Sequence, residues 1–526
     1  MKLCRMSLLA LALMAAAEAK PLVYCSEAAP EGFDSGMFTA AATNDAAAEA
    51  IYNRLVEFEP GTTKVIPALA ERWEISKDGL EYTFYLRRGV KFHTTEWFKP
   101  SRDMNADDVL WSFQRMLDPK HPGAQASPQG WPYASDMGFP ELIKKIEKLD
   151  PYTVKFTLNQ PEAPFLADLG MAFTDIVSAE YALQLDKAGR SSDINLKPVG
   201  TGPFVFKRYD KGAQIRYEAN PSYWRGKQLT DKLIFAITQD GAVRTQKLKS
   251  GECNIMVYPN PADIPGLKAD PKLTVLQSPA LLLTYVAFNA KKPQLRDKRV
   301  RQALALAIDK KSMINAVWQG NAAPAHLPLP SRIWGYDKTI PAYGMDVEKA
   351  KKLLKEAGYP NGFELNIMVR SGSSGSNPNP KLSAEMLQND WRKIGVNAKV
   401  TVLEWVELQK RTKAGEHDVT VYGWSGDNGD PDNFLTPNLS CASAESGEGR
   451  AHWCNKAFDK LLDQAKRTTD IAARTKFYEQ AQKIFIEEMP WATLAEPLNT
   501  VAFQKAVTGY VPSPFTNNNF EGVGIK

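Results

Sequence analysis

Residues 364–403 read ELNIMVRSGSSGSNPNPKLSAEMLQNDWRKIGVNAKVTVL. Glu364–Val369 is typical of a strand, Lys381–Ile394 has the apolar spacing of a helix, and Ala398–Leu403 is a second strand. A helix between two strands indicates parallel pairing and therefore an α/β fold. The polar segment Ser371–Pro380 lies between the first strand and the helix. Ligands favour the carboxyl ends of strands in such sheets, so this segment is a candidate binding loop, with a plain linker as the alternative.

A second polar turn follows another expected strand. Residues 418–434 read DVTVYGWSGDNGDPDNF, in which an alternating run ends in Gly, Asn and Pro. Asp427, Asp430 and Asp432 then lie beside Trp424. Carboxylates with an aromatic neighbour suit a cationic group such as the ammonium end of a peptide. A solvated acidic loop is the alternative interpretation.

Three further elements are expected outside this region. A hairpin turns at Lys77–Gly79, and a helix begins after the capping residue Asn105. A long helix is expected over Val300–Trp318, because its apolar residues recur at helical spacing.

The chain starts with MKLCRMSLLALALMAAAEAK, which has the pattern of a secretory signal peptide. Lys2 and Arg5 precede the short apolar run Ser7–Ala17, and a small-x-small cleavage site follows. We expect removal of residues 1–19 and a mature protein outside the cytoplasm; a retained membrane anchor is the alternative.

Length and charge composition limit the number of domains and the class of partner. About 500 mature residues predict two or three domains. The 65 Lys and Arg residues barely exceed the 60 Asp and Glu residues and form no basic run, which argues against nucleic acid as a partner.

Four cysteines remain after cleavage, and an even number in an exported protein suggests two disulfides. Pairing the near neighbours Cys441 and Cys454 leaves Cys25 with Cys253. Zinc is the rival interpretation, but no CxxC or suitably spaced histidine is present, so we predict no metal site.

Catalytic motifs are missing. The sequence has no HExxH, Walker A loop or GxGxxG, and the GSSGS at Gly372–Ser376 is not a GxSxG nucleophile motif. The five histidines are scattered along the chain. Counting carboxylates alone does not exclude a glycosidase with paired acids. We predict that the protein is not an enzyme and needs no cofactor.

Five stretches resemble the periplasmic solute-binding proteins of peptide ABC transporters, and particularly their dipeptide-binding members. They are LAERWEISKDGLEYTFYLRRGVKFH (Leu69–His93), MNADDVLWSFQRM (Met104–Met116), PVGTGPF (Pro198–Phe204), VRQALALAIDKKSMI (Val300–Ile314) and GWSGDNGDPDNF (Gly423–Phe434). The similarity extends over essentially the whole mature chain.

The resemblance implies a bilobal, type II-like periplasmic-binding-protein fold with an extra domain and a hinged ligand cleft. It also implies the two disulfide pairings given above. Domain I would combine 20–52, 203–278 and 497–526, domain II would span 53–202, and domain III would span 279–496.

The resemblance also implies a ligand site. The matching residue for the peptide ammonium is Asp430, within the loop Asp427, Asn428, Gly429 and Asp430. A threonine of the N-terminal segment that lines the site matches Thr39. Trp405 and Trp424 are candidates for the pocket wall, or alternatively for the core.

One position departs from the dipeptide-binding pattern. The arginine that holds the peptide carboxylate is replaced by Ser374, which Gly375 and Ser376 follow. The nearest arginine, Arg370, lies four residues away, or about 13 Å of extended chain, so the sequence argues against it as a replacement. Either another cation receives the carboxylate, or the ligand is not a simple free dipeptide.

The resemblance therefore predicts a monomeric periplasmic receptor. It would capture dipeptides or other short peptides and deliver them to an inner-membrane ABC permease. A binder of haem or antimicrobial peptides is the first alternative, and a periplasmic hydrolase is the second.

Overall fold

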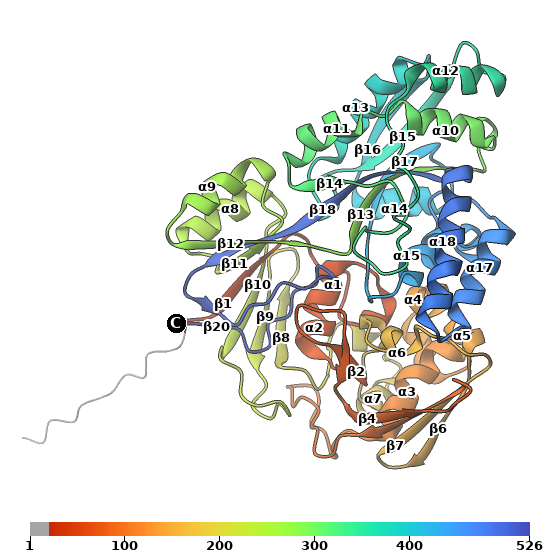
Figure 1. Cartoon of the computed structure of the whole chain (residues 1–526). Coiled ribbons are helices and arrows are strands. Elements are labelled where there is room, and N and C mark those ends of the chain that lie inside the picture. Colours follow the sequence, from red (N-terminus) through yellow and green to blue (C-terminus); the bar gives the residue numbers. More distant parts are fainter. Residues whose placement is uncertain (1–19) are drawn as a thin grey trace, which may run out of the picture.

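The structure, a computed structural model, describes residues 20–526 (Figure 1). The expected signal peptide at 1–19 lies outside the described residues. The largest sheet has the strand order β16-β15-β17-β13-β18-β11-β1-β10-β9-β8, and β12 and β14 also pair with β18. The long strand β18 (Trp491–Gln504) therefore joins two sheet regions into one.

One region of this sheet has the expected α/β arrangement. Strand β15 (Glu364–Arg370) is parallel to β16 (Asn397–Leu403) and to β17 (Val419–Ser425). Helix α13 (Pro380–Arg392) connects β15 to β16 and buries Leu387 and Trp391 in the core. The α/β prediction is confirmed, and the polar segment lies at the carboxyl end of β15.

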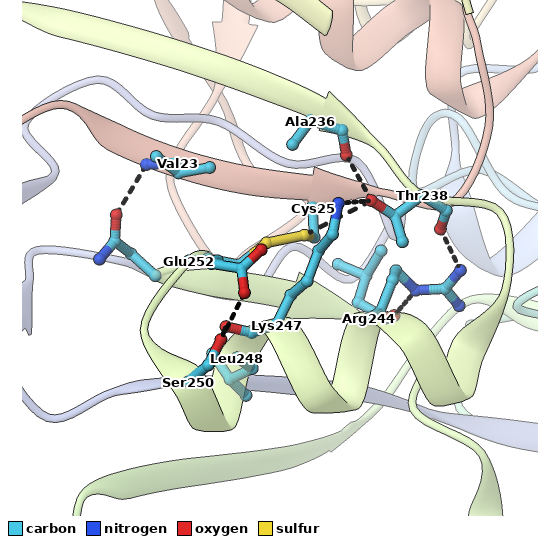
Figure 2. Close-up of a disulfide and its surroundings, with 12 residues drawn as sticks. Val23, Cys25, Ala236, Thr238, Arg244, Lys247, Leu248, Ser250 and Glu252 are labelled. Carbon is cyan, nitrogen blue, oxygen red and sulfur yellow. Dashed lines mark hydrogen bonds between the residues drawn. A yellow bond between two sulfur atoms is a disulfide. The ribbon is translucent and has the colours of Figure 1, made fainter. Parts of the chain in front are cut away.

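The other region brings the N-terminus to the middle of the chain. Strand β1 (Leu22–Ser26) is parallel to β10 (Lys232–Ile237) and to β11 (Ile255–Val257). The disulfide Cys25–Cys253 fastens β1 beside helix α8 (Gly241–Ser250), as Figure 2 shows.

The second disulfide joins Cys441 to Cys454 over a sequence separation of 13 residues. Both predicted pairings are therefore confirmed.

A separate sheet has the strand order β4-β5-β7-β6. The predicted hairpin is β4 (Ala70–Ile75) with β5 (Glu81–Leu86), and it continues into β7 (Thr153–Leu158) and β6 (Ile143–Asp150). Helix α3 (Ala106–Leu117) begins at Asn105, whose side chain accepts a hydrogen bond from the backbone of Asp107 at 2.8 Å. Both expectations are confirmed.

The single long helix expected over Val300–Trp318 is wrong. The chain forms α10 (Lys298–Leu306), then α11 (Lys310–Met313), and then a π-helical turn at Ile314–Trp318. Asp309 causes the break, because its side chain accepts a hydrogen bond from the backbone of Ser312 at 3.0 Å and so starts a new helix. Apolar spacing does not reveal such an internal cap.

Two chain segments run between the sheet regions. Strand β12 (Leu273–Pro279) leads directly into β13 (Leu282–Phe288), and β18 pairs with both of them. Figure 1 shows β18 extending from the β13 side to the β12 side. The three-domain division stays a prediction.

Within residues 20–526, no helix combines the length and the apolar character that crossing a membrane requires.

Candidate ligand-binding site

A cavity of about 960 Å³ lies among segments that are far apart in the sequence. Its wall includes the turn after β1, the polar segment after β15, the end of β17 and residues of the C-terminal segment. Ligand pockets in proteins typically have about 300–1,000 Å³, so this cavity has room for a ligand larger than a single amino acid.

The polar segment forms part of the wall, with Ser374, Gly375 and Ser376 facing the cavity. The indole of Trp318 and the hydroxyl of Thr284 donate hydrogen bonds to the Ser376 carbonyl, at 3.2 and 2.5 Å. A Cβ added to Gly375 would lie 2.8 Å from the Tyr258 ring, so any larger residue would displace that ring.

Arg370 also lines the cavity, contrary to the sequence-based argument that set it aside. It is the last residue of β15, and its guanidinium carbon lies 4.9 Å from the centre of the Trp405 ring. Trp405 in turn packs 5.3 Å from the Tyr422 ring. Burial lowers the pKa of the Arg370 guanidinium. The end of β15, rather than the loop, places this side chain in the cavity wall.

Asp427 is the carboxylate of the acidic turn that lines the cavity. Its backbone N–H donates to the Asn433 side chain at 2.8 Å, and the Tyr133 hydroxyl donates to its carboxylate. Burial raises the pKa of the Asp427 carboxyl to about 7, although these hydrogen bonds favour the ionised form. A cationic ligand group would relieve this cost of burial.

Asp430, the expected receiver of a ligand ammonium, is not among the residues that line the cavity. Asp430 lies behind the cavity wall and forms an ion pair with Arg474 at 2.7 Å. The Tyr478 hydroxyl donates a hydrogen bond to it at 3.2 Å. Both partners belong to α18 (Ile471–Glu488), so Asp430 fastens the turn to this helix. Its charge is already compensated within the protein.

Asn428 and Gly429 also lie outside the residues that line the cavity, and both bond to other parts of the protein. The Asn428 amide donates to the Asp168 carboxylate at 2.7 Å, and the Gly429 carbonyl accepts from the Trp334 indole at 3.1 Å. A Cβ on Gly429 would lie 2.6 Å from Thr63. The turn thus presents Asp427 to the cavity and packs its other residues against the 53–202 segment and α18.

The remaining predicted residues, Thr39, Trp405 and Trp424, are in the cavity wall. The Trp424 indole N–H is buried and has no hydrogen-bond partner among the described residues. Sequence reasoning missed Glu27, Asn44 and other wall residues because they come from distant segments, and no local motif marks them.

Carboxylates outnumber cations in the wall, with nine against three guanidinium groups. Several are compensated locally; for example, Glu57 pairs with Arg225 at 2.6 Å, and Glu448 pairs with Arg450 at 3.0 Å. Asp427 and Glu27 have no cation within ion-pair distance among residues 20–526. The cavity is therefore suited to a ligand with cationic groups.

A family model described as bacterial extracellular solute-binding proteins, family 5 middle, matches residues 64–446. The chain belongs to this family. It is 55% identical over 521 residues to di/tripeptide-binding protein 4 of Pseudomonas aeruginosa (strain UCBPP-PA14), with 98% of each chain covered. It is also 47% identical over 503 residues to heme-binding protein A of Haemophilus influenzae (strain ATCC 51907 / DSM 11121 / KW20 / Rd), with 96% of this chain and 92% of that protein covered.

A solved structure has the same fold. It is the dipeptide binding protein of Pseudoalteromonas sp. SM9913 in complex with Met-Leu, with a TM-score of 0.93 and 37% identity, covering 96% of this chain and all of the other. Family 5 consists of solute-binding proteins rather than enzymes. Within residues 20–526, no group of three or more His, Cys, Asp or Glu side chains is placed to hold a metal ion.

Proposed function

We propose that this family 5 protein is the peptide receptor of an ABC transporter. It would capture di- and other short peptides in the periplasm and deliver them to an inner-membrane permease. The observation that carries the proposal is the isolated Asp427 carboxylate in the cavity wall. The names of the relatives support the same ligand class.

In this proposal Asp427 receives the peptide ammonium. A buried ammonium needs an anionic partner, because an uncompensated buried charge costs several kcal/mol. The hydrogen bonds from Tyr133 and from the Asp427 backbone to Asn433 hold the turn in one orientation. Ligand binding would then lower the raised pKa of Asp427 and keep the carboxylate ionised.

Arg370 is the proposed partner of the peptide carboxylate. It is one of three guanidinium groups in the wall. The other two are committed, because Arg54 pairs with Glu49 and Asp175, and Arg450 pairs with Glu448. The Trp405 ring supports the flat guanidinium from one side, and Nε donates to the Ser371 carbonyl at 3.4 Å, so the terminal N–H groups are the ones that would bind a ligand.

Binding would close the cavity by rotation about the two strand crossings near β12 and β18. Tyr133 and Asn428 already link the 53–202 segment to the acidic turn, through Asp427 and Asp168. Closure would remove water from the ligand and strengthen its polar contacts. The closed, loaded form would dock on the permease, and residues 1–19 would direct export.

Haem is the alternative ligand, since one relative is named as a heme-binding protein. Haem carries two propionate groups, which a wall with nine carboxylates against three guanidinium groups disfavours. Histidine, a common axial ligand of haem iron, is not among the described lining residues. These observations favour the peptide.

Calorimetry on the mature protein, unfolded and refolded to remove any retained ligand, tests the proposal. We expect Ala-Ala or Ala-Ala-Ala to bind, and N-acetylation to weaken the same peptide by at least tenfold. No binding of either peptide, or a Soret band on addition of hemin without peptide binding, would overturn it.

A further inference from the structure

Three buried oxygen atoms of cavity-lining residues have no hydrogen-bond partner among residues 20–526. They are Glu27 Oε2, Asn44 Oδ1 and Asn517 Oδ1, and all three residues line the cavity. We call them the acceptor cluster. Asn44 is more than nine-tenths buried, with 8% of its surface exposed. Buried polar atoms are normally satisfied, so three such acceptors in one wall indicate a missing donor.

Asp45 connects the three chain segments that carry the acceptor cluster. Glu27 follows β1, Asn44 lies on α1 (Ala41–Ala46), and Asn517 belongs to the C-terminal segment. Asp45, the neighbour of Asn44, accepts hydrogen bonds from the backbone and the side chain of Asn518, both at 2.7 Å. Burial raises the pKa of Asp45, and the nearby Glu27 charge raises it further, as expected for two neighbouring carboxyl groups.

The orientation of one amide is fixed by its other contact. The Asn517 Nδ2 group donates to Glu49 Oε1 at 2.8 Å, which leaves Oδ1 as the free atom. Glu49 itself is engaged by Arg54 at 3.4 Å and by Asn519 at 3.0 Å. The wall around Asn517 therefore offers an acceptor to the cavity.

The cations nearest to Glu27, Arg244 and Arg370, form no ion pair with its carboxylate among the described residues. Arg244 donates to the backbone carbonyls of Thr238, Gln239, Val257 and Tyr258 at 2.8–3.3 Å, and Figure 2 shows its bond to Thr238. Arg370 attracts Glu27, but among the described residues no ion pair joins them. Tyr24, Asp45 and Tyr258 are the other titratable groups near Glu27.

The Glu27 carboxylate oxygen and the two amide oxygens are hydrogen-bond acceptors. A lysine ammonium has three donors and no acceptor, and an arginine guanidinium has five donors. Either group would supply the donors that the acceptor cluster lacks and a charge opposite to that of Glu27. An acidic side chain would be repelled, and an aliphatic one would leave all three oxygens unpaired.

We propose that the cavity selects peptides that carry a lysine or arginine side chain, and that the acceptor cluster binds this side chain. The inference rests on the proposed peptide-binding function and names its substrate class. Asp427 would bind the terminal ammonium, while Glu27, Asn44 and Asn517 bind the second cationic group.

Calorimetry with two sets of tripeptides tests this inference. The first set places one lysine at each position of an alanine tripeptide, and the second replaces each lysine by norleucine, which keeps the chain length and loses the ammonium. We expect at least one lysine peptide to bind tenfold or more tightly than its norleucine counterpart. Equal affinity in all three pairs would overturn the proposal.

The variants Glu27→Gln and Asn44→Ala are expected to reduce this lysine-to-norleucine ratio by at least fivefold. Since each ratio is measured within one variant, partial loss of folded protein does not affect it. Glu59→Gln is the matched control, because Glu59 also lines the cavity but pairs with Lys64 at 3.4 Å. An unchanged ratio in both cluster variants would contradict the assignment.

The tripeptide measurements distinguish failure of peptide binding from failure of side-chain selection. If no tripeptide of either set binds, the proposed peptide-binding function is wrong. If lysine and norleucine peptides bind equally well, peptide binding stands and only the acceptor cluster loses its role.

Discussion

Replacing Asp427 by Asn, and comparing the result with the same change at Asp430, distinguishes the roles of these two carboxylates in ligand binding. Asn keeps the size of Asp and still accepts the hydrogen bond from the Tyr133 hydroxyl, but it has no charge for a peptide ammonium. Truncating one partner of a buried charge pair costs about 2–5 kcal/mol. Because the substitution is isosteric, we expect about 2–3 kcal/mol, which corresponds to a roughly 30- to 150-fold loss of affinity.

Isothermal calorimetry with Ala-Ala or Ala-Ala-Ala measures this loss directly. Asp430→Asn is the matched control, because it makes the same change three residues away. It leaves Arg474 without its carboxylate partner, so we expect the free energy of unfolding to fall by about 3–5 kcal/mol. The affinity of the protein that stays folded should change less than threefold.

The opposite pattern would refute the reasoning. If Asp430→Asn abolished binding at full stability while Asp427→Asn bound normally, the ammonium site would be at Asp430, despite its ion pair with Arg474. If neither variant lost affinity, the acidic turn would have no direct role in recognition.

Three further predictions concern pH, the carboxylate end and the short disulfide. Burial raises the pKa of Asp427 to about 7, and a bound ammonium lowers it. Peptide affinity should therefore be full above pH 7 and fall about 100-fold by pH 5, as Asp427 of the free protein becomes protonated. A calorimetric affinity that stays constant over this range would contradict the assignment. Arg370→Met should weaken binding of a free peptide by about 10- to 100-fold and of its C-terminal amide much less, and equal losses for both would exclude the Arg370 contact. Replacing Cys441 and Cys454 by Ser should lower the free energy of unfolding by about 3 kcal/mol, measured by denaturant titration, whereas no loss would show that the loop is held by its other contacts.

For the acidic turn, the sequence predicted the kind of site but not which carboxylate lines the cavity. Its composition indicated a site for a cationic group at the end of β17, and the structure places Asp427 in the cavity wall there. The sequence favoured Asp430, because nothing near it in the sequence shows Arg474, which lies 44 residues later on α18 and pairs with it. An ion pair between distant segments decides which of two similar carboxylates is available.

Arg370 is a residue that the sequence argued against and that the structure places in the cavity wall. Distance along the chain argued against it, whereas strand β15 and the Trp405 ring place its guanidinium at the cavity. The sequence, through its resemblance to the dipeptide-binding pattern, indicated serine in place of arginine at Ser374, but it did not indicate that Arg370 lines the same cavity.

By itself, the sequence determined the α/β class, the two disulfides, the family and the residues of the loops at the strand ends. These follow from local periodicity, from cysteine counting and from motifs that are contiguous in the chain. The tertiary structure alone decided which charges are compensated and which remain free, as for Asp427 against Asp430 and for Glu27 beside Asn44 and Asn517. Compensation depends on distances between side chains from separate segments, and only folding sets those distances.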